Sequence, residues 1–154
     1  MSLAVGGDLC QPEHAWSALV TVVTRLLGPL GLATLDSEDW AYRGDYDNGN
    51  QSEDKSVAHG ANYHQGPEWV WPVGFLLRAL ISVSSRLGVG EQAQCQQIVR
   101  QVLARLWSHL RSSEWMGLPE LTNRNGAMCR DSNPIQAWSM STICLLYTSD
   151  AADE

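Results

Sequence analysis

Positive charge is scarce in this sequence. Its 154 residues include ten lysines and arginines against seventeen aspartates and glutamates, which leaves a formal net charge of −7. Lysine occurs only once, at Lys55. Proteins that hold the phosphate backbone of nucleic acids need a surplus of basic side chains. We therefore expect no nucleic-acid partner.

Long apolar runs and closely spaced cysteines are also missing. No uninterrupted apolar stretch approaches the roughly 20 residues of a membrane helix, and the first residues lack the basic head of a secretory signal. The cysteines form no C-x-x-C pair, which argues against zinc or redox chemistry. Their wide spacing favours reduced thiols over a disulfide framework. These features predict a cytoplasmic protein without a membrane partner. The cysteines are Cys10, Cys95, Cys129 and Cys144.

The apolar residues present are enough for one folded domain, and their spacing is helical. Apolar residues make up 44% of the chain, which also has seven tryptophans. Their periodicity predicts helices over about residues 13–27, 67–88 and 91–110, and a fourth from Pro134 onward. Gly28-Pro29 ends the first helix, and Pro67 suits a first helical turn. No long segment alternates with period two, so a sheet is not expected.

A loop of nearly forty residues separates the first two helices, and one of about twenty residues separates the last two. Loops of such length in a compact domain are usually functional or disordered. They hold most of the aromatic and amide residues, so we expect the functional site in them. Residues 36–54 are strongly acidic and resemble a solvated face. Asp45-Tyr-Asp47-Asn-Gly49 matches a calcium-binding loop only in part, so no metal site is predicted.

The first candidate motif is Asn62–Pro72, at the end of the first long loop. It combines side chains that suit a sugar, because indole faces stack on pyranose C–H faces while amides, imidazoles and carboxylates bind hydroxyls. The alternatives are a structural role for His64, a helix-dipole interaction for Glu68 and core packing for the indoles. The candidate sugar-binding residues are Tyr63, His64, Gln65, Glu68, Trp69 and Trp71.

The second candidate motif is Gly117–Asn123, followed by Gln136-Ala-Trp-Ser139. Glu120 lies between Pro119 and a polar loop, where a carboxylate can serve as a general base. The alternative is a solvated loop carboxylate or a helix cap. Asn123 and Trp138 are further candidates for sugar binding, and Trp138 has core packing as its alternative.

Several separated motifs, in their order along the chain, resemble the C-terminal end of the glycogen debranching enzymes. The resemblance covers roughly residues 13–143. It implies an all-α fold in which this region closes an (α/α)6 toroid. The four helices and two long functional loops expected in this chain would form part of that toroid. The motifs are Tyr63–Gly66, Trp69–Pro72, Leu118–Asn123 and Gln136–Ser139, preceded by Leu27–Gly31, Thr34–Asp36 and Tyr46–Asn48, which fit the eukaryotic type.

The resemblance also implies an activity. It assigns the parent protein to the amylo-α-1,6-glucosidases, which hydrolyse α-1,6-linked glucose stubs of glycogen or limit dextrin with inversion and without a cofactor. Glu120 matches the catalytic base. The general acid of the family is an aspartate upstream of the matched stretch, and 4-α-glucanotransferase activity belongs to a separate N-terminal domain. We therefore expect an inactive fragment whose partner is the missing N-terminal part. The alternatives are a glucan-binding piece without chemistry and a purely structural half-toroid.

The two ends of the chain are interpreted separately. Residues 1–12 have no clear counterpart in the motifs and form an unmatched lead-in, ahead of the family-like segment 13–143. Residues 144–154 resemble an in-frame translation of a sequencing adaptor, with a frayed natural terminus as the alternative.

Overall fold

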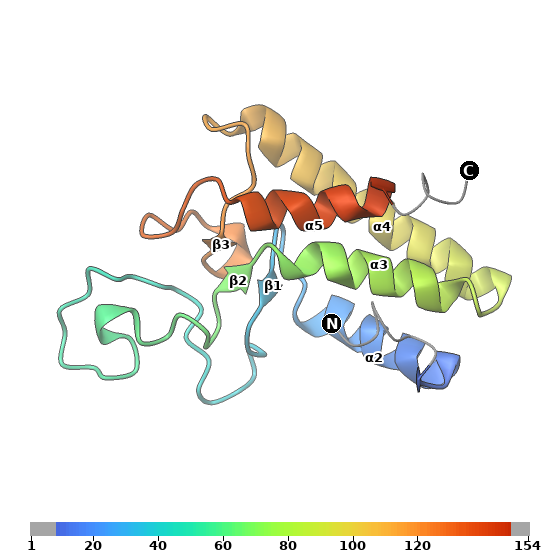
Figure 1. Ribbon diagram of the computed structural model, residues 1–154. Helices are drawn as coiled ribbons and strands as arrows, with labels where there is room; N and C mark the ends of the chain where they lie inside the picture. The colour runs from blue at the N-terminus through green and yellow to red at the C-terminus, as the bar shows by residue number, and fades with distance from the viewer. Residues whose placement is uncertain (1–8, 149–154) are drawn as a thin grey trace.

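The computed structural model describes residues 9–148, and this part of the chain is mainly helical. Its four α-helices lie against one another, and a small antiparallel sheet lies at one end of them (Figure 1). The four expected helices are therefore present, together with a sheet that was not expected. The helices are α2 (Pro12–Arg25), α3 (Pro72–Ser84), α4 (Val89–Ser112) and α5 (Ala137–Thr148). The strands are β1 (Leu32–Ala33), β2 (Glu68–Trp69) and β3 (Leu121–Thr122).

The expectation that no sheet forms was wrong. The three strands pair antiparallel in the order β1-β2-β3. Each strand has only two residues, which is too short for an alternating pattern to be visible in the sequence. The sheet forms because backbone groups of segments far apart in the chain become buried together and need hydrogen-bond partners.

One predicted helix start was also wrong. The second helix begins at Pro72 rather than Pro67, because Glu68 and Trp69 pair with both neighbouring strands. Pro72 occupies the first turn of α3, where its missing N–H leaves no helical bond unmade. The fourth helix, expected near Pro134, begins at Ala137 within the Gln136–Ser139 motif.

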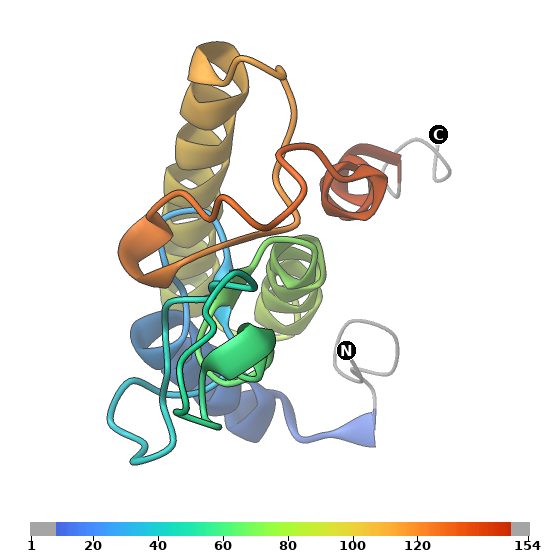
Figure 2. The ribbon, with the colours of Figure 1, turned by 90° about the vertical axis from the view of Figure 1, so that its left-hand side faces the viewer.

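Helix α3 is the centre of the fold. Figure 2 shows α3 between α4 and α5, with α2 on a further side, and α3 contacts all three. It is buried on most of its circumference, as expected for a helix that is apolar nearly all round. The approach to α5 is close, because a Cβ atom on Gly74 would overlap the backbone of Thr142. Among its fully buried side chains are Val73, Leu77 and Leu80.

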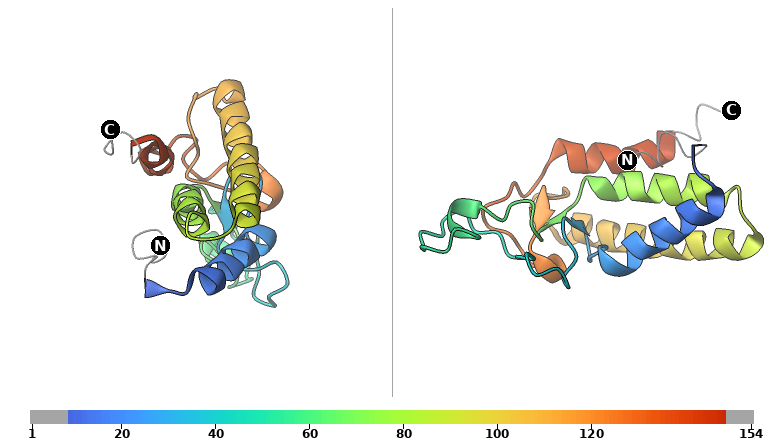
Figure 3. Two further views of the ribbon diagram at one scale, coloured as in Figure 1. Left: turned by 90° about the vertical axis from the view of Figure 1, so that its right-hand side faces the viewer. Right: turned by 90° about the horizontal axis from the view of Figure 1, so that it is seen from below.

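The sheet joins the two candidate motifs. Glu68 lies opposite Thr122 and Trp69 opposite Leu121, and the Val70 N–H donates to the Glu120 carbonyl at 3.1 Å. The loop between β1 and β2 extends away from the helices on this side of the molecule (Figure 3). The motifs are therefore adjacent at the end of the helical bundle.

Helix α5 continues past Ile143 into the segment that resembles an adaptor translation. Of residues 144–147, Leu146 is partly buried against the core, while Cys144, Leu145 and Tyr147 are exposed. We therefore expect deletion of residues 144–154 to lower the free energy of unfolding by less than about 1 kcal/mol, below the typical cost of a core defect. Urea unfolding of the full and shortened chains measures this. A larger loss would show that the segment belongs to the fold.

Candidate active site

Glu120 is held at the junction of the two motifs, directly before β3. Its side chain is half-buried. The Tyr63 hydroxyl donates to Glu120 Oε1 at 2.5 Å, while the Asn133 N–H approaches Oε2 at 3.4 Å. The backbone N–H of Glu120 also donates to the Asn133 carbonyl at 3.0 Å. The carboxylate is therefore fixed strongly through one oxygen and only weakly through the other.

Tyr63 is the centre of an aromatic cluster. Its ring centroid lies 4.9 Å from that of Tyr46, 4.9 Å from that of His64 and 4.7 Å from that of Trp69. The Trp69 indole N–H donates to the Tyr63 carbonyl at 3.1 Å. Burial raises the pKa of Tyr63, and the hydrogen bond to Glu120 raises it further. The phenol therefore remains protonated and acts as a donor.

His64 and Gln65 lie at the surface beside this cluster. The His64 ring stacks on the Trp69 indole, with centroids 5.1 Å apart and planes 15° from parallel. Gln65 is fixed through its backbone, which bonds to Asn62 and Arg43, and its side chain is exposed. Both side chains are therefore placed where a ligand over the cluster could meet them.

Two tryptophans from different elements form a second aromatic surface. Trp71 immediately precedes α3, and Trp138 lies in the first turn of α5. Their rings stack with centroids 4.2 Å apart and planes 8° from parallel. Trp138 is 49% exposed. Trp138 is therefore not packed in the core, which was the alternative to sugar binding. Its indole lies against Trp71 and remains open to solvent.

Glu68 points into the protein instead. It is 5% exposed, and its carboxylate accepts hydrogen bonds from Thr122 Oγ1 at 3.2 Å, Asn125 N–H at 2.7 Å and Gly126 N–H at 3.1 Å. Burial raises the pKa of Glu68, although these bonds oppose the shift. The interpretation as a helix-dipole partner was wrong, since α3 starts at Pro72. Glu68 stabilises the strand and turn that follow Glu120, and both of its carboxylate oxygens accept hydrogen bonds from that segment.

Asn123 and Asn62 hold the long loop in place. Asn123 Oδ1 accepts the backbone N–H of Tyr46 at 2.9 Å. Asn62 is fully buried, and its Nδ2 donates to the carbonyls of Arg43 and Asp45, both at 2.8 Å. Sequence reasoning noted Asn62 only as the start of a motif, because a buried loop asparagine gives no periodic signal. Sugar binding by Asn123 stays a prediction.

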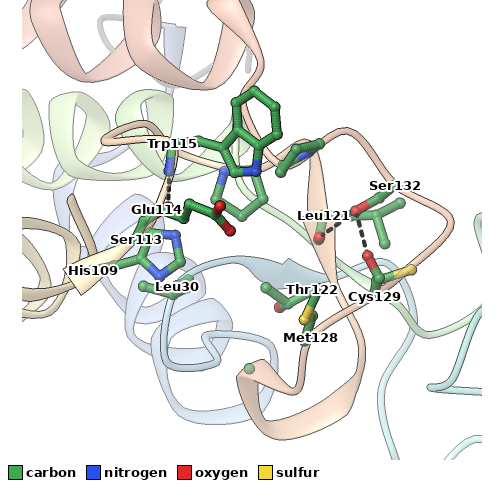
Figure 4. A pocket seen from close by; sticks show the side chains of 13 residues that line it. Leu30, His109, Ser113, Glu114, Trp115, Leu121, Thr122, Met128, Cys129 and Ser132 are labelled. Atoms are coloured by element: carbon green, nitrogen blue, oxygen red, sulfur yellow. Dashed lines mark hydrogen bonds between the residues drawn. The ribbon is translucent and has the colours of Figure 1, made fainter.

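A separate pocket of about 320 Å³ lies on another side of the segment that carries Glu120. Pro119 and Leu121, the neighbours of Glu120 in the chain, both line it. Alternation along an extended segment directs Glu120 away from the pocket. Figure 4 shows Glu114 and Trp115 on one side of it, across from Thr122 and Cys129. The pocket is therefore distinct from the Tyr63–Glu120 pair.

Within residues 9–148 there is no group of three or more His, Cys, Asp or Glu side chains placed to hold a metal ion. No helix of this part of the chain is long and apolar enough to cross a membrane. Cys95 and Cys129 are buried and Cys10 and Cys144 exposed, and all four are free.

A carboxylate fixed in a loop beside a cluster of aromatic side chains combines the polar and apolar groups that suit a sugar-binding site. The family model described as amylo-alpha-1,6-glucosidase matches residues 1–145. The chain is also 41% identical to the glycogen debranching enzyme of Saccharomyces cerevisiae, in an alignment that covers 95% of this chain. It therefore belongs to the amylo-alpha-1,6-glucosidase family, as the sequence motifs indicated. The aligned region is 10% of the yeast protein, so the chain spans about a tenth of that relative.

Proposed function

We propose that this chain is a C-terminal part of a glycogen debranching enzyme, where it supplies the catalytic base for hydrolysis of α-1,6-linked glucose stubs on glycogen or limit dextrin. The observation that supports this proposal is the half-buried Glu120 carboxylate, which is anchored by Tyr63, the central residue of an aromatic cluster. Such a carboxylate is oriented but retains an oxygen able to accept a proton. We assign the parent enzyme to the cytoplasm.

The proposed reaction is an inverting hydrolysis. Glu120 takes a proton from water, whose oxygen attacks the anomeric carbon while the bond from that carbon to the glucan oxygen breaks. A carboxylic acid elsewhere in the enzyme gives its proton to the leaving oxygen. The two carboxyl groups of such a pair stand roughly 6.5–9.5 Å apart, which leaves room for the water. We place that acid in the part of the enzyme upstream of this segment, together with a separate 4-α-glucanotransferase domain.

The exposed aromatic surfaces are proposed to bind the glucan. The open indole of Trp138 offers an apolar plane for a sugar ring, and it is supported from behind by Trp71. His64 and Gln65 offer hydrogen-bonding groups next to the Tyr63 cluster. If these residues bind glucan without any chemistry at Glu120, the chain would be a binding piece, which is the second candidate function.

The remainder of the enzyme is proposed as the partner that completes an (α/α)6 toroid around this segment. An apolar groove of about 500 Å³ lies between α4 and α5. Leu103, Leu110 and Met140 line it, as does Trp107, which is 61% exposed. Exposed apolar surface of this kind marks an interaction site. Further helices of the same polypeptide would bury it.

A graft tests the proposed function. Residues 13–143 replace the aligned segment of the yeast enzyme, and glucose release from phosphorylase limit dextrin is measured. We expect the graft to release glucose, because the segment supplies the base and its supporting rings. A Trp138→Ala graft should bind limit dextrin about 5- to 100-fold more weakly, as expected for loss of a stacking indole. A folded graft that binds limit dextrin but releases no glucose would favour the binding alternative.

A further inference from the structure

The two oxygens of Glu120 are held very differently. Oε1 accepts a short hydrogen bond of 2.5 Å from Tyr63, whereas the donor nearest to Oε2 is the Asn133 N–H at 3.4 Å. A bond of the second length is weak. We propose that Tyr63 is a positioning residue that occupies Oε1 and leaves Oε2 as the oxygen that takes the proton from water. This inference rests on the proposed function and assigns the roles of individual atoms within it.

The position of the Tyr63 hydroxyl is well determined by its surroundings. Three rings contact the phenol ring, with centroid distances between 4.7 and 4.9 Å. Trp69, which bonds to the Tyr63 carbonyl, is itself 9% exposed and packs against Leu121. Leu121 is the residue after Glu120. The donor and the acceptor are therefore tied to the same small cluster and cannot separate independently.

A fixed donor is useful at this position because the terminal torsion of a glutamate is broad. Without a partner, the carboxylate plane would rotate and present either oxygen to the water. The Tyr63 bond restricts that rotation, and it stabilises the ionised carboxylate that must accept the proton. The raised pKa of Tyr63 keeps the phenol neutral, so it does not compete as a base.

The sequence alone suggested that Tyr63 binds sugar, and the two roles predict different kinetics. Loss of a sugar contact present in both ground and transition states raises KM with little change in kcat. Loss of a positioning bond lowers kcat with little change in KM, because the interaction that orients the base acts on the chemical step and not on substrate binding.

The experiment uses the grafted enzyme with Tyr63→Phe, which keeps the ring and removes the hydroxyl. We expect kcat to fall about 10- to 100-fold, the loss that corresponds to one hydrogen bond to a charged group. KM should change less than about threefold. Tyr46→Phe is the matched control. It removes a hydroxyl from a neighbouring ring of the same cluster, and among the described hydrogen bonds this hydroxyl does not donate to Glu120. Its effect on kcat should be small by comparison.

A second variant changes the donor without removing it. Fluorinated tyrosine at position 63 keeps the ring and the hydroxyl donor, so kcat should stay within about threefold of the parent graft. A Tyr63→Phe graft that raises KM alone, or leaves kcat unchanged, would overturn the inference. The Glu120→Gln graft separates this failure from failure of the proposed function: if that graft is inactive while Tyr63→Phe behaves as the parent, only the positioning role is lost.

Discussion

Replacing Glu120 with glutamine in the grafted enzyme is expected to lower kcat for glucose release by about 10²–10⁴-fold, the usual contribution of general-base catalysis. Glutamine keeps the size of the side chain and can still accept the Tyr63 hydrogen bond. It has no oxygen basic enough to take a proton from water, so the chemical step loses its base. Glucose release from phosphorylase limit dextrin over time gives the rate directly.

The affinity of this variant for limit dextrin should change much less than its rate, because the Trp138 indole and the Gln65 amide proposed to bind glucan remain. Asp47→Asn is the matched control. It removes a carboxylate from an exposed loop position, where Asp47 Oδ1 accepts only the Gly49 N–H of its own turn among its described contacts. A Glu120→Gln graft that releases glucose as fast as its parent would show that Glu120 is not the base.

Glu68→Ala is expected to lower the free energy of unfolding of the chain by about 3 kcal/mol. The substitution removes the acceptor of three donors, two of them backbone N–H groups of the turn at Asn125 and Gly126. A buried donor left without a partner costs about 1–3 kcal/mol. The Thr122 bond is buried, whereas the two turn N–H groups are part-buried, so water recovers part of the cost at the turn. Urea unfolding followed by tryptophan fluorescence measures the difference.

Glu68→Gln separates charge from shape at the same position. Burial raises the pKa of Glu68 in the folded chain, so folding favours the protonated carboxyl. The stability gained from protonating Glu68 is fully present below the pKa of an unfolded glutamate, about 4.3. It is lost as pH rises through the pKa of Glu68 in the folded chain. We therefore expect the wild type to gain stability relative to Glu68→Gln as pH falls from 7 toward 4.3. A difference that is constant or reversed over this range would contradict the assigned cause.

The sequence by itself determined the helices and the family. A helix repeats its buried positions within a few residues, so α2, α3 and α4 were visible as stripes of apolar residues. The order of separated motifs indicated the family before any geometry was known. The length and composition of the two loops predict that the functional residues lie in them. Glu120 and Tyr63 both lie in these loops, and their functional roles stay predictions.

Only the tertiary structure decided which groups meet. The sequence pattern predicts a helix over Glu68 and Trp69, but in the structure they pair with strands from distant segments. Tyr63 and Glu120 are 57 residues apart, and no local pattern relates them. Trp71 and Trp138 stack only because α3 and α5 approach closely at Gly74. Local periodicity specifies elements, whereas a hydrogen bond between loops exists only after packing has brought its donor and acceptor together.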